Sequence, residues 1–216
     1  MSLPPKLSPL PGPAAVMAMR YDDSPVGPYL EMAVAVPARL GLRPGLCVVA
    51  MAVTSPEARL ACRSLWGLPA EVGALRWESD GRDRGMAWEG RGLAVHARPG
   101  GPAVAAVLPV RSLQWRDGAP VVLPRRLRAR VGPARCRVDV ADDGDPLAWL
   151  AGDHRGLVLH GARIVASPAR RPAGVVSSVP WRERVLPAPA EPAGGAASMT
   201  GPGRMAQLVR AQPSHG

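Results

Sequence analysis

The chain has 216 residues, enough for one domain of ordinary size and a terminal extension. Its hydrophobic content of 47% is that of a globular protein, which excludes an intrinsically disordered chain. The formal charge is +10, yet only Lys6 among the 27 basic residues is a lysine, and all the others are arginines.

The first part of the chain alternates short apolar runs with turn residues. Residues 1–13 are rich in proline and are expected to be irregular. Apolar runs then cover residues 14–19, 29–36 and 46–53, and their lengths and flanking turns favour strands over helices.

A helix is predicted directly after these strands, beginning at Ser55-Pro56-Glu57. Serine caps free backbone N–H groups, proline fits the first turn, and glutamate suits the positive end of the helix dipole. The helix is expected to end near Gly67, before Pro69. Its apolar stripe is predicted to contain Ala58, Leu60, Ala61 and Leu65.

Beyond the helix, strands are predicted at short spacing, separated by turn signals such as Asp80-Gly81 and Asp117-Gly118. They cover residues 72–79, 85–90, 93–98, 103–108, 110–116, 119–123, 126–131 and 135–140. A short helix is expected over residues 145–150 and a last long strand over residues 156–166. This succession predicts a mainly β fold with few helices (α+β), built as a largely antiparallel sheet or barrel.

Composition sets the expected domain boundaries and the cellular setting. One domain is predicted over residues 14–187, followed by an Ala/Pro/Gly-rich tail over residues 188–216 that is expected to be disordered. No stretch approaches the roughly 20 apolar residues that cross a bilayer, and no signal-peptide pattern opens the chain. The three cysteines are far apart and fit buried thiols in a reducing compartment. We therefore expect a cytoplasmic protein without membrane contact.

Several chemistries find no support in the residue patterns. The four histidines lack the spacing of metal ligands and no CxxC pair occurs, so neither a metal nor a cofactor is expected. No serine lies in a nucleophile elbow. Arg126, Arg128 and Arg130 alternate with apolar residues, which predicts a strand with one solvated basic face rather than a nucleic-acid footprint.

Two segments together resemble the acetoacetate decarboxylase family. The first is Gly27-Pro28-Tyr29-Leu30-Glu31, and the second is Trp66-Gly67-Leu68-Pro69-Ala70. In that family a Gly-x-Tyr-x-Glu strand precedes a helix that ends in Trp-Gly-x-Pro-Lys. The resemblance covers roughly residues 14–167 and implies the family's β-rich fold.

The family's essential lysine is missing from the matching position. That lysine forms a Schiff base with a β-keto acid, and here Ala70 takes its place, followed by Glu71 where a second lysine often stands. The resemblance also implies an active-site arginine from an N-terminal part that this sequence does not show. Lys6 lies in a proline-rich segment with no sign of burial, so little free amine is expected at neutral pH. Schiff-base catalysis is therefore not expected.

Glu31 is the candidate acid or base that remains. It lies in an apolar run and shares its predicted strand face with Tyr29, Ala33 and Ala35, so its carboxyl is expected to be buried with a raised pKa. The alternative is a structural pairing with an arginine such as Arg63. The candidate pocket residues are Tyr29, Glu31, Arg63, Trp66 and Pro69. Trp66 and Tyr29 also fit a purely structural role in the core.

Three functions stay open at this point. The first is a domain of this family that binds a small carbonyl or carboxylate compound in an apolar pocket, without Schiff-base decarboxylation. The second is an enzyme of another mechanism with Glu31 as general acid or base. The third is a basic, arginine-rich binding module. The expected partner is a small molecule; nucleic acid is disfavoured, and a homo-oligomer is left open.

Overall fold

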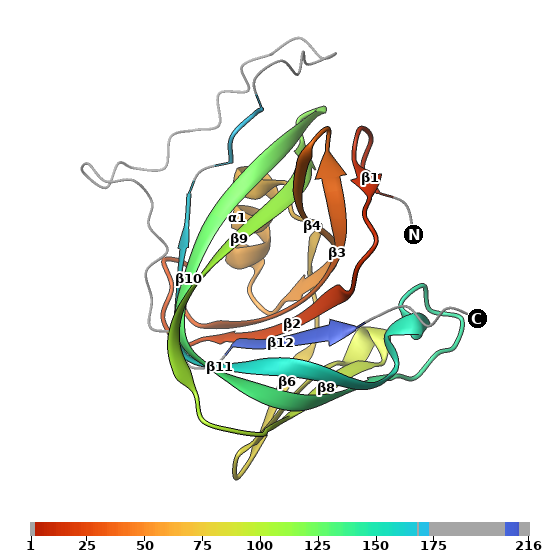
Figure 1. Ribbon diagram of the computed structural model, residues 1–216. Helices are drawn as coiled ribbons and strands as arrows, with labels where there is room; N and C mark the ends of the chain where they lie inside the picture. Colours follow the sequence, from red (N-terminus) through yellow and green to blue (C-terminus); the bar gives the residue numbers. More distant parts are fainter. Residues whose placement is uncertain (1–2, 168, 173–205, 212–216) are drawn as a thin grey trace.

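One strongly curled sheet forms most of the molecule in the computed structural model, which describes residues 3–167, 169–172 and 206–211. Figure 1 shows the sheet bending around its own interior, with the single α-helix of the described chain packed inside the curl. The elements are β1 (Ser8–Pro9), β2 (Ala14–Tyr21), β3 (Tyr29–Leu40), β4 (Arg43–Val53), α1 (Pro56–Trp66), β5 (Ala70–Val72), β6 (Leu75–Asp80), β7 (Asp83–Trp88), η1 (Glu89–Arg91), β8 (Leu93–Pro99), β9 (Val104–Arg116), β10 (Ala119–Val140), η2 (Ala148–Leu150), β11 (Gly152–Ala166) and β12 (Ala206–Ala211).

The sheet is mixed rather than closed into a regular barrel. Its strand order is β11-β12-β2-β3-β4-β9-β10-β8-β7-β6, and β10 also pairs with β11. Most neighbours are antiparallel, but β4 meets β9 in parallel at the single residue pair Leu46–Ser112. The predicted β-rich, largely antiparallel fold is confirmed, and this narrow junction leaves the curl without a continuous ladder of hydrogen bonds.

The helix forms where its sequence signals place it. The Ala58 N–H donates to Ser55 Oγ at 3.1 Å, which satisfies one free donor of the first turn. At the other end Gly67 adopts φ 65°, and the Leu68 N–H donates to the Cys62 carbonyl, so the chain turns out of the helix. The predicted apolar stripe is wrong in part: the buried residues are Ala58, Cys62 and Trp66, whereas Leu60 and Leu65 are exposed.

Two core clusters lie on opposite faces of the central strands. Along β3, Met32 and Val34 face the first cluster, which packs against β6, β7, β8 and β10. Tyr29, Ala33 and Ala35 face the second cluster, which packs against α1 and the beginning of β10. Because β2, β3 and β4 are covered on both sides, their sequences are apolar runs rather than alternating patterns.

Several predicted breaks do not occur. The strands predicted over residues 103–108 and 110–116 are one strand, β9, and the three predicted over residues 119–140 are one strand, β10. Pro133 is tolerated in β10 because β9 pairs only as far as Val131 and β8 begins at Ala134, so its missing N–H falls at the change of partner.

The ends of the chain are more ordered than expected in two places. Residues 8–9, predicted to be irregular, form β1 and pair with Arg39 and Ala38 of β3. Residues 206–211, predicted to belong to a disordered tail, form β12 between β11 and β2. The short helix expected over residues 145–150 is a 3-10 turn, η2. The remainder of the predicted tail lies outside the described residues.

Candidate functional site

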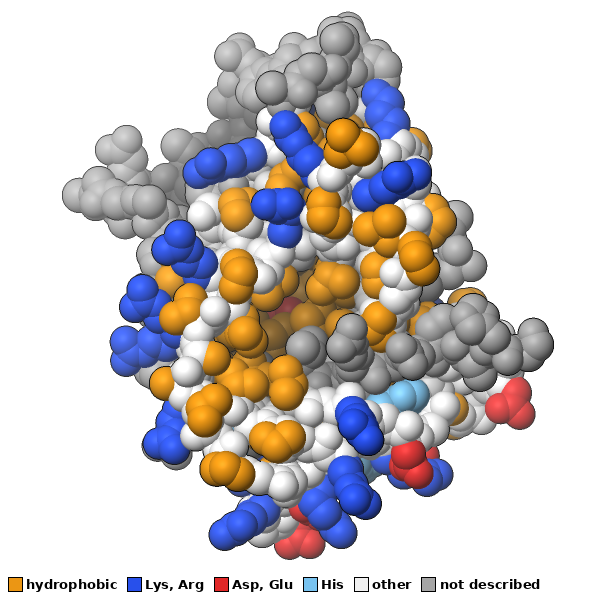
Figure 2. All heavy atoms as spheres, viewed as in Figure 1, with side chains coloured by type: hydrophobic (Ala, Val, Ile, Leu, Met, Phe, Trp, Pro, Cys, Tyr) orange, Lys and Arg blue, Asp and Glu red, His pale blue; other side chains and the backbone are white. Residues whose placement is uncertain are grey.

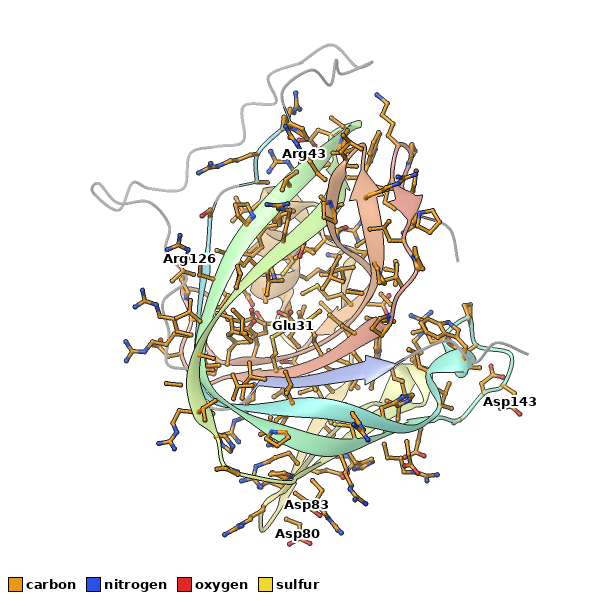
Figure 3. The ribbon with its side chains drawn as sticks, viewed as in Figure 1. Glu31, Arg43, Asp80, Asp83, Arg126 and Asp143 are labelled. Atoms are coloured by element: carbon orange, nitrogen blue, oxygen red, sulfur yellow. The ribbon has the colours of Figure 1, made fainter. Side chains whose placement is uncertain are left out.

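Glu31 lies inside the curl, in the cluster between β3, α1 and β10. Its side chain is only 4% exposed, and it faces the same side of β3 as Tyr29 and Ala33. Figure 3 labels Glu31 in the interior of the sheet. In the same view, Figure 2 shows a hollow with hydrophobic walls and an acidic side chain at its floor. The predicted burial of this carboxyl is thus confirmed.

Two tyrosines lie beside the carboxyl. Tyr21 of β2 pairs in register with Tyr29 of β3, and their rings stack with centroids 4.5 Å apart. The Tyr29 hydroxyl donates to Glu31 Oε2 at 3.5 Å. Burial raises the pKa of both phenols well above the usual value, so both keep their protons and remain hydrogen-bond donors.

Arg125 of β10 is the cation of this site. Its charge lowers the pKa of Glu31, Tyr21 and Cys62, which places the guanidinium close to all three groups. Its Cζ atom lies 5.6 Å from the centre of the Trp66 ring, a favourable cation–π contact.

The Nε–H of Arg125 is buried and has no hydrogen-bond partner among the described residues. Arg20 and Arg116 also carry a buried, unpartnered Nε, but each of those atoms lies near a carboxylate, on Asp22 and Asp117 respectively. Arg125 forms no such ion pair in the described part of the chain. A buried donor left without an acceptor costs roughly 1–3 kcal/mol, which makes it a natural contact for a ligand.

The carboxyl of Glu31 titrates near neutrality. Burial raises its pKa from 4.5 to about 7, while Arg125 and the two tyrosine hydroxyls oppose that rise. Burial therefore outweighs the nearby cation, and Glu31 exchanges its proton in the physiological range. This behaviour suits a group that either donates a hydrogen bond to a ligand or moves a proton.

The family motif reaches the same interior at α1 and β5. Trp66 and Ala70 are buried in the cluster that contains Tyr29, and Ala70 pairs with Met51 of β4. Cys62, one turn before Trp66, lies close enough to Glu31 for the carboxylate to raise its pKa further. The methyl side chain of Ala70 thus lies in the Glu31 cluster.

Three other motif residues lie outside this interior. Arg63, Pro69 and Glu71 are exposed. Arg63 donates to the Ala70 carbonyl at 3.4 Å, so it ties α1 to β5 and does not pair with Glu31. The sequence-based pairing of Glu31 with Arg63 is wrong because the arginine points outward from the last turn of the helix.

Lys6 is exposed in the turn before β1. It lies in the segment that leads to the outer strand β1, whereas Glu31 is buried on the inward side of β3. The chain therefore supplies no lysine side chain to the interior.

Sequence reasoning missed Arg125, Tyr21 and Cys62. Arg125 was hidden between two predicted strands that are in fact continuous. Along the continuous strand β10, Arg125 lies on the same face as the buried Val121 and Leu123, and the exposed Arg126 lies on the opposite face. Tyr21 could be placed beside Tyr29 only with the register of β2 and β3. The signal for Cys62 was its four-residue spacing from Ala58 and Trp66, which puts all three on one face of the helix.

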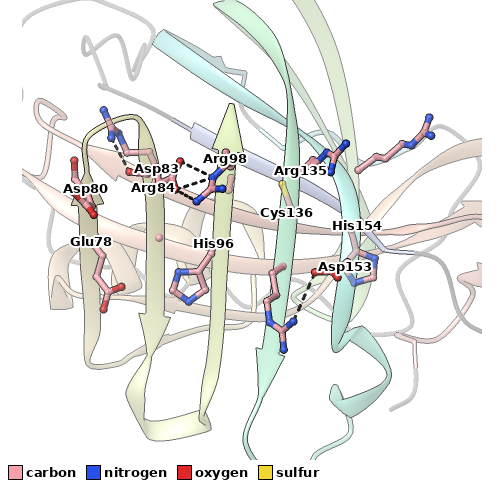
Figure 4. Close-up of a pocket in the computed structure, with 15 residues that line it drawn as sticks. Glu78, Asp80, Asp83, Arg84, His96, Arg98, Arg135, Cys136, Asp153 and His154 are labelled. Atoms are coloured by element: carbon pink, nitrogen blue, oxygen red, sulfur yellow. Dashed lines mark hydrogen bonds and ion pairs between the residues drawn. The ribbon is translucent and has the colours of Figure 1, made fainter. Parts of the chain in front are cut away.

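A second, open groove of about 760 Å³ lies on the outside of β6, β7, β8, β10 and β11. Charged side chains of this groove pair with one another: Arg98 with Asp83, as Figure 4 shows, and Arg137 with Asp153. Its lining contains both acids and arginines and lies apart from the Glu31 cluster. Near-balanced charge of this kind is typical of a solvated surface.

No group of three His, Cys, Asp or Glu side chains converges on a common point in the described ranges. None of the described helices is long and apolar enough to span a membrane.

Comparison with known proteins places this geometry in context. A family model described as acetoacetate decarboxylase matches residues 2–138. Acetoacetate decarboxylase from Legionella pneumophila is 12% identical with a TM-score of 0.48, over 98% of this chain and 76% of that one. A second acetoacetate decarboxylase structure is 11% identical with a TM-score of 0.47, over 97% and 91% of the two chains.

The enduracididine biosynthesis enzyme MppR, solved with pyruvate, is 11% identical with a TM-score of 0.44, over 73% of this chain and 91% of that one. A comparison with curated proteins finds no match.

Proposed function

Because this chain belongs to the acetoacetate decarboxylase family, we propose that it binds a small keto acid or related carboxylate inside the curled sheet and does not decarboxylate it through a Schiff base. The observation that supports the proposal most directly is the buried, unpartnered Nε–H of Arg125 beside a carboxyl that titrates near neutrality.

The ligand's carboxylate pairs with the Arg125 guanidinium. A charge-assisted hydrogen bond to a buried arginine is about twice as strong as a neutral one. In its protonated form Glu31 donates to the ligand's carbonyl oxygen, and its neutrality keeps it from repelling the carboxylate. Apolar walls from Trp66, Ala33 and Val53 surround the carbon skeleton.

Schiff-base chemistry requires an unprotonated amine beside the ligand's carbonyl carbon. At the family's lysine position this chain has the buried Ala70, and its one lysine, Lys6, is exposed before β1. The ligand is therefore held without a covalent bond. Without that bond no iminium forms, so no group accepts the electrons of the carbon–carbon bond that breaks when carbon dioxide leaves.

Binding is tested by NMR titration with levulinate, a keto acid, and acetylacetone, a neutral diketone. Levulinate affinity should be highest below pH 7, because Glu31 is then neutral and Arg125 is uncompensated. Above pH 7 the ionised carboxylate cancels the guanidinium charge, and affinity should fall by up to about tenfold per pH unit. Acetylacetone should show little of this pH dependence.

Arg125→Gln should weaken levulinate binding by about tenfold or more. Arg126→Gln is the matched control, since it removes the neighbouring arginine, whose side chain is exposed on the outer face. Equal affinity in the two variants, or levulinate binding that strengthens above pH 7, would contradict the proposal.

A second function is favoured by the pKa of about 7 at Glu31, which is well matched to general acid–base catalysis at neutral pH. In that case Glu31 would take a proton from the carbon next to the ligand's carbonyl group. The same titration in deuterated water separates the two functions. Exchange of that proton in the wild type, lost in Glu31→Gln, would indicate catalysis rather than binding alone.

A further inference from the structure

The outer face of β10 and β11 carries a cluster of basic side chains. Arg128, Arg130, His160 and Arg163 line an open groove of about 570 Å³, together with small residues such as Ala105. No acidic residue lines this groove. Figures 2 and 3 show basic side chains along this edge of the sheet, where Arg126 is labelled. We refer to these four basic residues as the outer cluster.

The strand register places basic side chains directly opposite one another. Arg128 pairs with Arg163, and Arg130 pairs with His160. Side chains at such positions lie about 5 Å apart at Cβ, and the like charges of Arg128 and Arg163 there destabilise the sheet by roughly 0.2–1 kcal/mol. Folding alone would favour a carboxylate at one position of each pair, as at Arg137 and Asp153 farther along the same two strands.

A β-bulge brings two of these side chains onto one face. The two pairs, Arg128–Arg163 and Arg130–His160, form two rows across the strands. From the first row to the second, β10 advances by two residues and β11 by three. The extra residue is absorbed at Gly161, which has φ 58°. His160 and Arg163 are three apart, so an unbroken strand would point them to opposite faces of the sheet.

The bulge also leaves space between the basic side chains. A Cβ atom built on Gly161 would meet no atom within 4 Å. Arg128 and Arg163 form no ion pair among the described residues, and Arg130 contacts the Ala103 carbonyl at 3.1 Å. The arginines of the groove in Figure 4 are different, since acidic side chains neutralise Arg98 and Arg137.

We propose that the outer cluster is a binding site for the diphosphate group of a small soluble molecule. Its two rows, Arg128–Arg163 and Arg130–His160, are separated by two residues of β10, or about 6.7 Å. Each row offers guanidinium donors that suit one phosphate group. No Phe, Tyr or Trp side chain on which bases would stack lines the groove, which disfavours single-stranded nucleic acid as the ligand.

Calorimetric titration with inorganic pyrophosphate tests this site. The wild type should bind one pyrophosphate saturably, and binding should weaken with salt. Arg128→Gln and Arg163→Gln should each reduce affinity by about tenfold or more, because each removes a charge-assisted contact. Arg126→Gln is the matched control, because it removes an exposed arginine two residues along the same strand face that does not line the groove. It should change affinity by less than about twofold.

The competing outcomes are distinct. Equal loss in Arg126→Gln and Arg128→Gln would mean diffuse attraction to a basic surface and would overturn the site. So would the absence of saturable pyrophosphate binding, or binding to duplex DNA alone. Circular dichroism of each variant confirms folding, and Arg128→Lys, which keeps the charge but loses the planar fork, should recover only part of the affinity.

Discussion

Replacing Glu31 with glutamine is expected to stabilise the protein at alkaline pH relative to acidic pH. The wild-type carboxyl has a pKa of about 7 in the folded state and 4.5 as its ordinary value. Between those values the folded protein keeps a proton that the unfolded chain has lost, so wild-type stability falls as pH rises through this window. Glutamine does not titrate, so the stability of the variant does not fall in this pH window.

The expected size follows from the same shift. From about pH 4 to pH 9, the free energy of unfolding of Glu31→Gln minus that of the wild type should rise by on the order of 3 kcal/mol. Urea unfolding at several pH values measures the difference. Glu71→Gln, which removes an exposed carboxylate, should show a change within about 0.5 kcal/mol. A flat profile for Glu31→Gln would mean that folding leaves the pKa of Glu31 at its ordinary value.

Placing a lysine at position 70 should create an amine that forms an imine. Ala70 is fully buried and packs in the cluster with Trp66 and Tyr29. Burial should lower the pKa of a lysine there, which increases its free-amine fraction at neutral pH. Acetoacetate with borohydride should then leave a covalent adduct on Ala70→Lys, detectable by peptide mass spectrometry.

The adjacent residue supplies the control for this variant. Glu71 follows Ala70 in β5 and is exposed, so Glu71→Lys should keep an ordinary pKa and give no adduct above that of the wild type. Overpacking at position 70 should cost about 1–3 kcal/mol, which thermal unfolding records. Equal labelling of the two variants, or none in a folded Ala70→Lys, would show that position 70 does not face a ligand-accessible interior.

The sequence predicted the parts of this fold that depend on local signals. The cap at Ser55, the turn at Gly67 and the apolar runs of β2, β3 and β4 follow from side-chain chemistry within a few residues. The full length of β10 did not, because Pro133 looks like a strand end until the change of partner from β9 to β8 is known. The β4–β9 junction likewise depends on contacts between distant segments.

Only the local features of the candidate site could be predicted from the sequence. Burial of Glu31 could be inferred from its apolar surroundings in the sequence. The cation beside Glu31 could not, since Arg125 lies 94 positions later (125 − 31) and reaches it only because the sheet curls. The stacking of Tyr21 on Tyr29 required the register of two neighbouring strands.

We propose that this protein holds its ligand without a lysine amine beside the ligand's carbonyl carbon. The most direct test is the release of carbon dioxide from acetoacetate by the purified wild-type chain, measured with borohydride trapping on the same sample. We predict release at the uncatalysed rate and no adduct within residues that line the Glu31 cluster. Release well above that rate, with an imine trapped on the chain, would contradict the proposed binding without a Schiff base.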